Sequence, residues 1–111
     1  MMKEIVDKLR AKELIYKKLI MIDNKDLKTR KKIEVYEAVD FDGYYTALFS
    51  LVQKSRFLRK DAIVLEELYA RLKVLQDHNF KKKILLYNMP FCSKAQAQLK
   101  DEGWRLIDAT L

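Results

Sequence analysis

Glycine and proline are scarce in this chain, which has two glycines and one proline in 111 residues. That scarcity excludes a flexible linker or a disordered tail and predicts an ordered chain rich in helices and strands. The single cysteine excludes an internal disulfide and is typical of a reducing compartment. Residues 1–23 carry charges every few positions, which excludes a signal peptide or a membrane span there. We therefore expect one cytoplasmic domain over residues 1–111, with no membrane role.

Positive charge is in excess, with 23 Lys and Arg against 16 Asp and Glu, a net charge of +7. This excess favours a polyanionic partner, which is DNA, RNA or an acidic protein. The alternative is the solvated surface of a lysine-rich protein. A nucleic-acid binder should gather its basic residues on one continuous surface. The candidate contacts lie in the runs 28–32, 54–60 and 81–83 and are Lys28, Arg30, Lys31, Lys32, Arg56, Arg59, Lys60, Lys81, Lys82 and Lys83.

Residues 31–56 organise the rest of the chain. Asp42-Gly43 lies between two apolar runs and predicts a β-hairpin with these two residues as its turn, so that Phe41 faces Tyr44. Neither face of the hairpin is cleanly polar, which is typical of a sheet covered on both sides. The alternative interpretation is a helix over 44–56 with Asp42 as its N-cap.

The remaining elements follow from hydrophobic spacing. An apolar stripe predicts a helix over 2–19, and leucines at three- and four-residue spacing predict another over 61–77 with Asp61 as its cap. A continuous apolar run predicts a buried strand over 83–88. Ser93 and Gln96 indicate a capping box for a helix over 94–102, which ends at Gly103. A strand over 104–107 completes a right-handed crossover with two parallel strands.

These elements predict an α/β fold with a mixed four-stranded sheet. The sheet is a β-hairpin plus two parallel strands, flanked by three helices that cover both faces.

The sequence from Gln53-Lys54-Ser55-Arg56 through a long helix to KKILLYNMPFCSKAQAQLKDEGWRLIDATL resembles a known family. It is similar to the second half of the restriction-endonuclease-like fold, in particular to the catalytic domain of Mrr-type restriction endonucleases. The resemblance spans residues 33–111 and lies mostly in the pattern of elements. In that family a strand ends in Gln/Glu-x-Lys, and a helix then leads to an apolar strand. The resemblance implies a nuclease-like protein that acts on DNA or RNA.

The family's chemistry also implies a magnesium site. An Asp and a Glu or Gln hold the divalent metal, and a Lys orients the attacking water or steadies the phosphate. In this chain the candidates are Glu34 and Gln53 for the metal, with Lys54 in support. The predicted register places Lys32 opposite Gln53 and Glu34 diagonally beside it on the same face. Ser55 stands at the family's lysine position, so Lys54 reaches the right face only if the strand bulges near Gln53.

Other residues also have side chains that could bind a ligand or catalyse a reaction, but a structural role is the favoured interpretation for each of them. Cys92 at a helix start is expected to be structural. The lone His78 lies in a polar turn and predicts no zinc site and no catalytic triad. Four aromatic residues can stack on bases but are expected in the core, and they are Tyr44, Tyr45, Phe49 and Trp104.

Two functions remain. The first is a nucleic-acid-binding protein of restriction-endonuclease-like fold, in either a degenerate form that only binds or a divergent form that hydrolyses phosphodiesters with Mg²⁺. Because Ser55 stands at the family's lysine position and Lys54 lies one residue before it, the form that binds without cleavage is favoured. The second is a small interaction or regulatory subunit that uses its basic face for an acidic protein partner or an edge strand for a homodimer.

Overall fold

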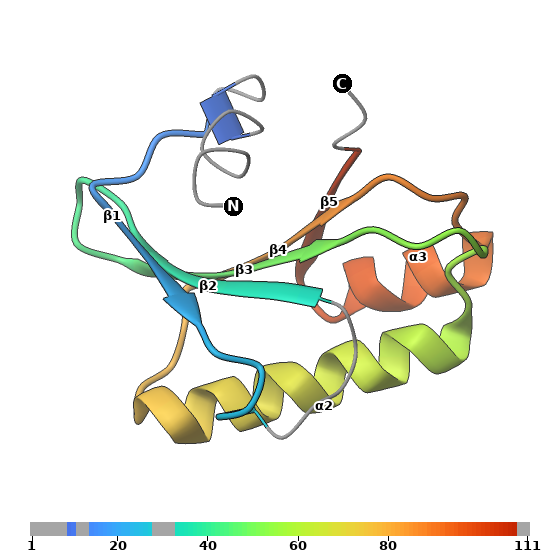
Figure 1. The fold of residues 1–111 in the computed structure, drawn as a ribbon. Helices are drawn as coiled ribbons and strands as arrows, with labels where there is room; N and C mark the ends of the chain where they lie inside the picture. Colours follow the sequence, from blue (N-terminus) through green and yellow to red (C-terminus); the bar gives the residue numbers. More distant parts are fainter. Residues whose placement is uncertain (1–8, 11–13, 28–32, 109–111) are drawn as a thin grey trace.

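The structure, a computed structural model, describes residues 9–10, 14–27 and 33–108. The elements in chain order are β1 (Lys18–Ile22), β2 (Ile33–Val39), β3 (Tyr45–Leu51), α2 (Arg59–Gln76), β4 (Lys82–Tyr87), α3 (Ser93–Asp101) and β5 (Trp104–Asp108). All five strands form one mixed sheet in the order β1-β2-β3-β4-β5 (Figure 1). The pairs β1–β2 and β2–β3 are antiparallel, whereas β3–β4 and β4–β5 are parallel.

The α/β class and the parallel unit over β4, α3 and β5 are confirmed. The counts of four strands and three helices are wrong, because the described residues contain five strands and two helices.

The predicted helix over 2–19 is wrong at its C-terminal end. Residues 14–17 are not helical, and Lys18–Ile22 form β1, which pairs with β2 from Lys18 opposite Val39 to Ile22 opposite Val35. The pairing partners lie 13 to 21 residues further along the chain, so no local pattern indicates them. The N-terminal part of this predicted helix lies mostly outside the described residues.

The β2–β3 hairpin is confirmed and the alternative helix over 44–56 is excluded, but the predicted register is wrong by one residue. The loop has three residues between Asp40 and Tyr44 rather than two. The Asp40 carboxylate accepts hydrogen bonds from the backbone N–H groups of Asp42 and Tyr44, and Gly43 adopts a positive φ of 88°. A turn followed by a left-handed glycine is the usual three-residue hairpin loop.

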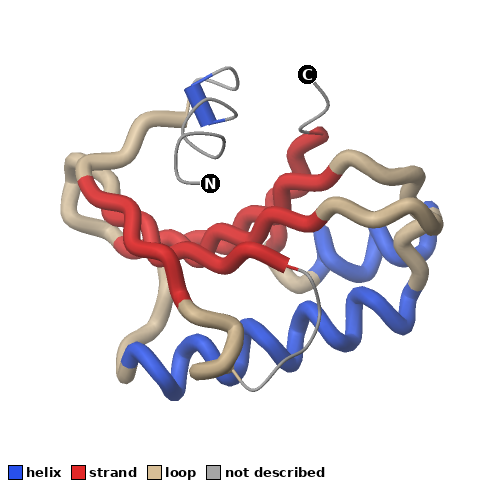
Figure 2. Tube along the Cα trace, viewed as in Figure 1, coloured by secondary structure: helices blue, strands red, loops and turns tan. Residues whose placement is uncertain are grey.

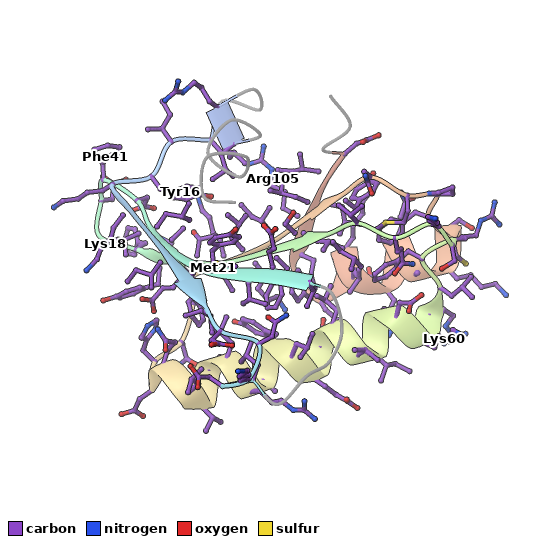
Figure 3. The ribbon with its side chains drawn as sticks, in the orientation of Figure 1. Tyr16, Lys18, Met21, Phe41, Lys60 and Arg105 are labelled. Atoms are coloured by element: carbon purple, nitrogen blue, oxygen red, sulfur yellow. The ribbon has the colours of Figure 1, made fainter. Side chains whose placement is uncertain are left out.

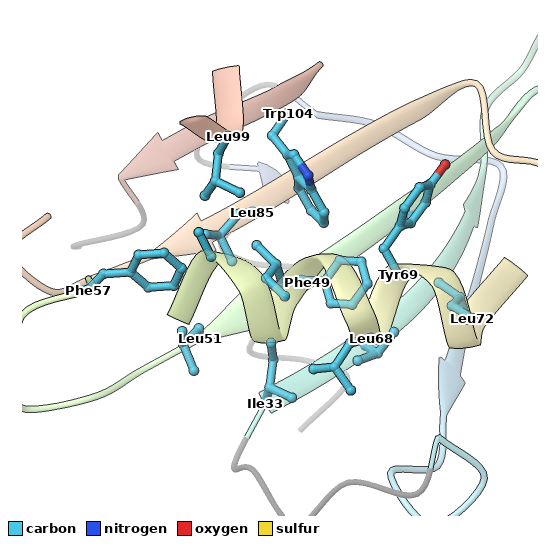
Figure 4. Close-up of a cluster of buried hydrophobic side chains, with 14 of the residues drawn as sticks. Ile33, Phe49, Leu51, Phe57, Leu68, Tyr69, Leu72, Leu85, Leu99 and Trp104 are labelled. Carbon is cyan, nitrogen blue, oxygen red and sulfur yellow. The ribbon is translucent and has the colours of Figure 1, made fainter. Parts of the chain in front are cut away.

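Helices α2 and α3 pack on the same face of the sheet, and the helical residues 9–10 lie on the opposite side (Figure 2). The larger hydrophobic cluster lies between α2 and α3 and the sheet, and it includes Phe49 and Leu85 from the central strands, Leu68 and Leu72 from α2 and Leu99 from α3 (Figure 4). On the opposite face a smaller cluster joins strand residues to Leu9, Leu14 and Tyr16 of the N-terminal segment. The sheet is thus covered on both sides, as the mixed polarity of the hairpin predicts.

The helix ends differ in detail from the prediction. Helix α2 begins two residues earlier than predicted, with Leu58 as N-cap, and the Asp61 carboxylate accepts a hydrogen bond from the Leu58 backbone N–H. Helix α3 has Cys92 as its N-cap without a side-chain cap bond, so the predicted Ser93–Gln96 capping box is wrong. Gly103 follows α3 with the predicted positive φ, at 90°. Neither described helix is long and apolar enough to cross a membrane.

Candidate functional site

Glu34 and Ser50 lie opposite each other where β2 begins and β3 ends. Both side chains lie on the sheet face away from α2 and α3, because their neighbours Ile33 and Leu51 belong to the cluster under the helices. Glu34 is half-buried, and its carboxylate accepts a 2.7 Å hydrogen bond from the hydroxyl of Tyr36. Ser50 is buried. This end of the sheet therefore presents one carboxylate beside hydroxyl groups.

Gln53 and Lys54 lie beyond this ladder. The pairing of β2 with β3 is uninterrupted over seven residues and ends at Leu51, so no bulge within it carries either residue toward Glu34. The Gln53 side-chain amide donates to the Ser55 carbonyl at 3.1 Å, and Lys54 is exposed. The predicted register beside Glu34 is wrong, because the three-residue loop shifts β3 by one position and brings Ser50 there instead.

The described residues around Glu34 show no cluster of metal ligands of the kind that the resemblance implies. A magnesium ion in a protein is held by carboxylate oxygens together with water and substrate phosphates. Among the residues that the structure describes, no three His, Cys, Asp or Glu side chains come close enough to hold a metal ion. The position facing Glu34 is occupied by Ser50, whose hydroxyl is neutral.

The predicted basic contacts separate into two groups. Arg56, Arg59 and Lys60 are exposed around the start of α2, at the end of the sheet where β3 and β4 finish. Lys81 and Lys82 are exposed at the opposite end, where β4 begins. Figure 3 shows this separation through its labels, with Lys60 at one end of the molecule and Lys18 at the other.

Lys83 differs from the other basic contacts. It is half-buried, and its Nζ lies over the rings of Tyr69 and Trp104, at 4.8 Å and 5.2 Å from their centroids. The run 28–32, with Lys28, Arg30, Lys31 and Lys32, lies outside the described residues. The described candidate contacts therefore lie at two ends of the sheet rather than on the single continuous surface that would mark a nucleic-acid binder.

A pair that the sequence did not indicate links β2 to the turn after α2. Glu37 is buried with 6 % exposure, and its Oε1 lies 2.5 Å from Nε2 of His78. The His78 ring packs against Tyr45, with centroids 4.0 Å apart. This pair was not predicted from the sequence, although Glu37 is the one charged residue on the otherwise apolar strand face of Ile33, Val35 and Val39, which could have pointed to a buried partner.

The Cys92 thiol has a lowered pKa. The backbone N–H groups of Ala95 and Lys94 at the start of α3 are the largest causes, and the positive charge of Arg56 adds to them. We predict that alkylation of Cys92 by iodoacetamide shows its inflection at a lower pH than a free thiol, and that Arg56→Gln moves this inflection upward. An inflection at or above that of N-acetylcysteine, measured in parallel, would contradict the prediction.

Comparison with known proteins supports the fold. No protein-family model matches the chain, and a search of curated protein sequences also finds no match. Among solved structures, a repair endonuclease from Pyrococcus abyssi matches with a TM-score of 0.58 and 18% identity, over 97% of this chain and 46% of that one. A structure of EndoMS in apo form matches with a TM-score of 0.55 and 16% identity, over 96% of this chain and 44% of that one. This chain thus spans less than half the length of either protein. Its fold is restriction-endonuclease-like, as the sequence resemblance implied.

Proposed function

We propose that this protein binds nucleic acid through a restriction-endonuclease-like fold and does not cleave it. The observation that carries the proposal is the pairing of Glu34 with Ser50, next to an end of the sheet that is bordered by exposed arginine and lysine. In the family that the chain resembles, a Glu or Gln and a Lys two residues apart complete the metal site. In the observed register, the positions with that spacing beside Glu34 are Ser50 and Val52, and neither side chain carries a charge.

Double-stranded DNA is the first ligand to test. One of the proteins with a similar fold is described as a repair endonuclease. Phosphate contacts by Arg56, Arg59 and Lys60 would supply affinity without sequence selectivity. The net charge of +7 would favour the encounter with any such polyanion.

We predict that charge reversal at the start of α2 weakens DNA binding in a salt-dependent manner. Arg59→Glu or Lys60→Glu should each reduce the slope of log affinity against log salt concentration by about 1, because each change removes about one phosphate contact. An acidic side chain suits the first turn of a helix, so neither change should unfold α2. Fluorescence anisotropy with a labelled duplex at several salt concentrations measures the slope.

Lys100→Glu is the matched control, since Lys100 is an exposed lysine in the last turn of α3. It changes the net charge by the same amount and should leave the slope nearly unchanged. Equal effects of all three substitutions would show attraction by net charge alone, which would contradict a site at the start of α2.

A second candidate function is metal-dependent cleavage by Glu34 and Gln53 with Lys54 in support. The observation that favours it is the half-buried carboxylate of Glu34 at the start of β2. It requires Gln53 and Lys54 to approach Glu34 when substrate binds. Failure to bind any nucleic acid at low salt would instead leave an acidic protein partner or a homodimer as the functions to test.

A further inference from the structure

The tip of the β2–β3 hairpin carries aromatic rings that are not part of the core. Phe41 is 70% exposed. Tyr44 and Tyr45 are 47% and 39% exposed, so the prediction that they lie in the core is wrong, whereas Phe49 and Trp104 are buried as predicted. The Nζ of Lys81 lies 3.4 Å from the centroid of the Tyr44 ring. This end of the sheet therefore combines exposed rings with a cation held against one of them.

Lysines flank the rings on both neighbouring strands. The Lys17 backbone N–H donates to the carbonyl of Val39, just before the hairpin loop, and the Lys81 backbone N–H donates to the carbonyl of Tyr45, just after it. All four lysines around the tip are exposed, and they are Lys17, Lys18, Lys81 and Lys82. In Figure 3 the labelled Phe41 and Lys18 lie together at this end of the molecule.

A hollow of about 180 Å³ opens beside the hairpin on the face away from the helices. Its lining includes two cationic side chains, Lys82 and Arg105, and the hydroxyl groups of Tyr16 and Thr46. The Asp40 carboxylate also lines it, but one of its oxygens accepts the two N–H groups of the hairpin loop. The hollow is smaller than pockets for drug-sized ligands, which start at about 300 Å³, and suits a single phosphate group.

We propose that the hairpin tip and this hollow form a second contact surface, and that its ligand is single-stranded nucleic acid. Unpaired bases would stack on Phe41 and Tyr44, and a backbone phosphate would bind between Lys82 and Arg105. The bases of a duplex are stacked on one another and do not offer free faces to such rings, so a single strand fits better. The interleaving of rings with lysines also fits a polyanion better than an apolar protein partner, which would prefer a continuous apolar patch.

This surface is separate from the start of α2. β3 runs between the two ends of the sheet and its seven residues span about 20 Å. The inference rests on the proposed function in that its ligand is also a nucleic acid, but it adds a second binding surface and a preference for single strands. Single strands and duplexes should thus depend on different residues.

Substitution of the rings tests the inference. Phe41→Leu and Tyr44→Leu keep apolar bulk but remove the aromatic face, and each should weaken binding of a labelled thymidine oligonucleotide about tenfold. Tyr44→Phe retains the ring and should bind like the parent protein. Binding of a labelled duplex should be unchanged in all three variants. Lys82→Gln and Arg105→Gln should each reduce the salt slope for the single strand.

Cross-linking gives an independent readout that does not depend on affinity. A bromouridine-containing oligonucleotide, photo-cross-linked and mapped by mass spectrometry, should label the peptide that contains Phe41 and Tyr44. Thermal melting confirms that the variants fold, which is expected because the loop hydrogen bonds to the Tyr44 backbone do not involve its side chain.

The outcomes separate the inference from the proposed function. If the leucine variants bind the single strand like the parent protein, or the cross-link maps elsewhere, the second surface is overturned while duplex binding still supports the proposed function. If the parent protein binds neither ligand at low salt, both fail. If the leucine variants lose duplex and single-strand binding equally, the preference for single strands is overturned.

Discussion

Replacing His78 with alanine is expected to lower the free energy of unfolding by about 1–3 kcal/mol, which is the cost of leaving a buried hydrogen-bonding group without its partner. Glu37 is buried, and the structure places its Oε1 2.5 Å from the imidazole of His78. Without the imidazole, this acidic side chain would lose the partner that the structure gives it. The ring also packs against Tyr45 and Phe80, so its contacts with both would be lost.

Chemical denaturation measures this effect, and a second substitution shows its cause. Glu37→Gln in the His78→Ala background replaces the carboxyl group that has lost its partner and should recover part of the lost stability. Residues in direct contact are expected to be non-additive in this way. A His78→Ala protein whose stability lies within about 0.5 kcal/mol of the parent, the range typical of surface substitutions, would contradict a stabilising pair.

Replacing Phe49 with alanine is expected to lower the free energy of unfolding by about 3–5 kcal/mol. Phe49 lies in β3, the central strand, and is fully buried against the helices. Its ring meets that of Trp104 edge to face, with centroids 5.3 Å apart. Removal of the ring would leave a cavity between the sheet and α2, which two packed layers cannot close without moving.

Val74→Ala is the control for that experiment. Val74 lies on α2 and is 81% exposed, so its loss should change stability by less than about 0.5 kcal/mol. Equal denaturation midpoints for the Phe49→Ala and parent proteins would contradict the placement of β3 at the centre of the core.

The elements that could be predicted from sequence are those fixed by local signals. The leucine spacing of α2, the apolar run of β4 and the glycine after α3 each act within a few residues. The Asp42-Gly43 pair also favoured a strand after the turn, although a helix over 44–56 stayed open as the alternative. The restriction-endonuclease-like resemblance followed from the order of these elements.

What could not be predicted depends on contacts between distant residues or on a single side chain. β1 is a strand because it pairs with β2, and its sequence alone resembles the end of an amphipathic helix. The register of the hairpin depends on the Asp40 carboxylate, which holds a three-residue loop where Asp42-Gly43 suggested two. That shift of one residue moves every pairing along β3 and brings Ser50, rather than Gln53, to the vicinity of Glu34.

The separation of the candidate basic residues into two groups could not be predicted from the sequence either. The runs 54–60 and 81–83 are separated by α2, and the parallel pairing of β3 with β4 places them at opposite ends of the sheet. For this reason the sequence left open whether the candidate contacts share one surface, and the structure separates them into two groups.

The most direct test of the account measures binding and strand integrity in the same samples. Labelled single- and double-stranded DNA and RNA are incubated with the protein at two salt concentrations, with and without Mg²⁺, and examined by anisotropy and then by denaturing gel. The account predicts binding that weakens as salt rises, with every strand intact at full length. Cleavage that requires Mg²⁺ and is abolished by Glu34→Ala or Gln53→Ala would contradict it and establish a nuclease.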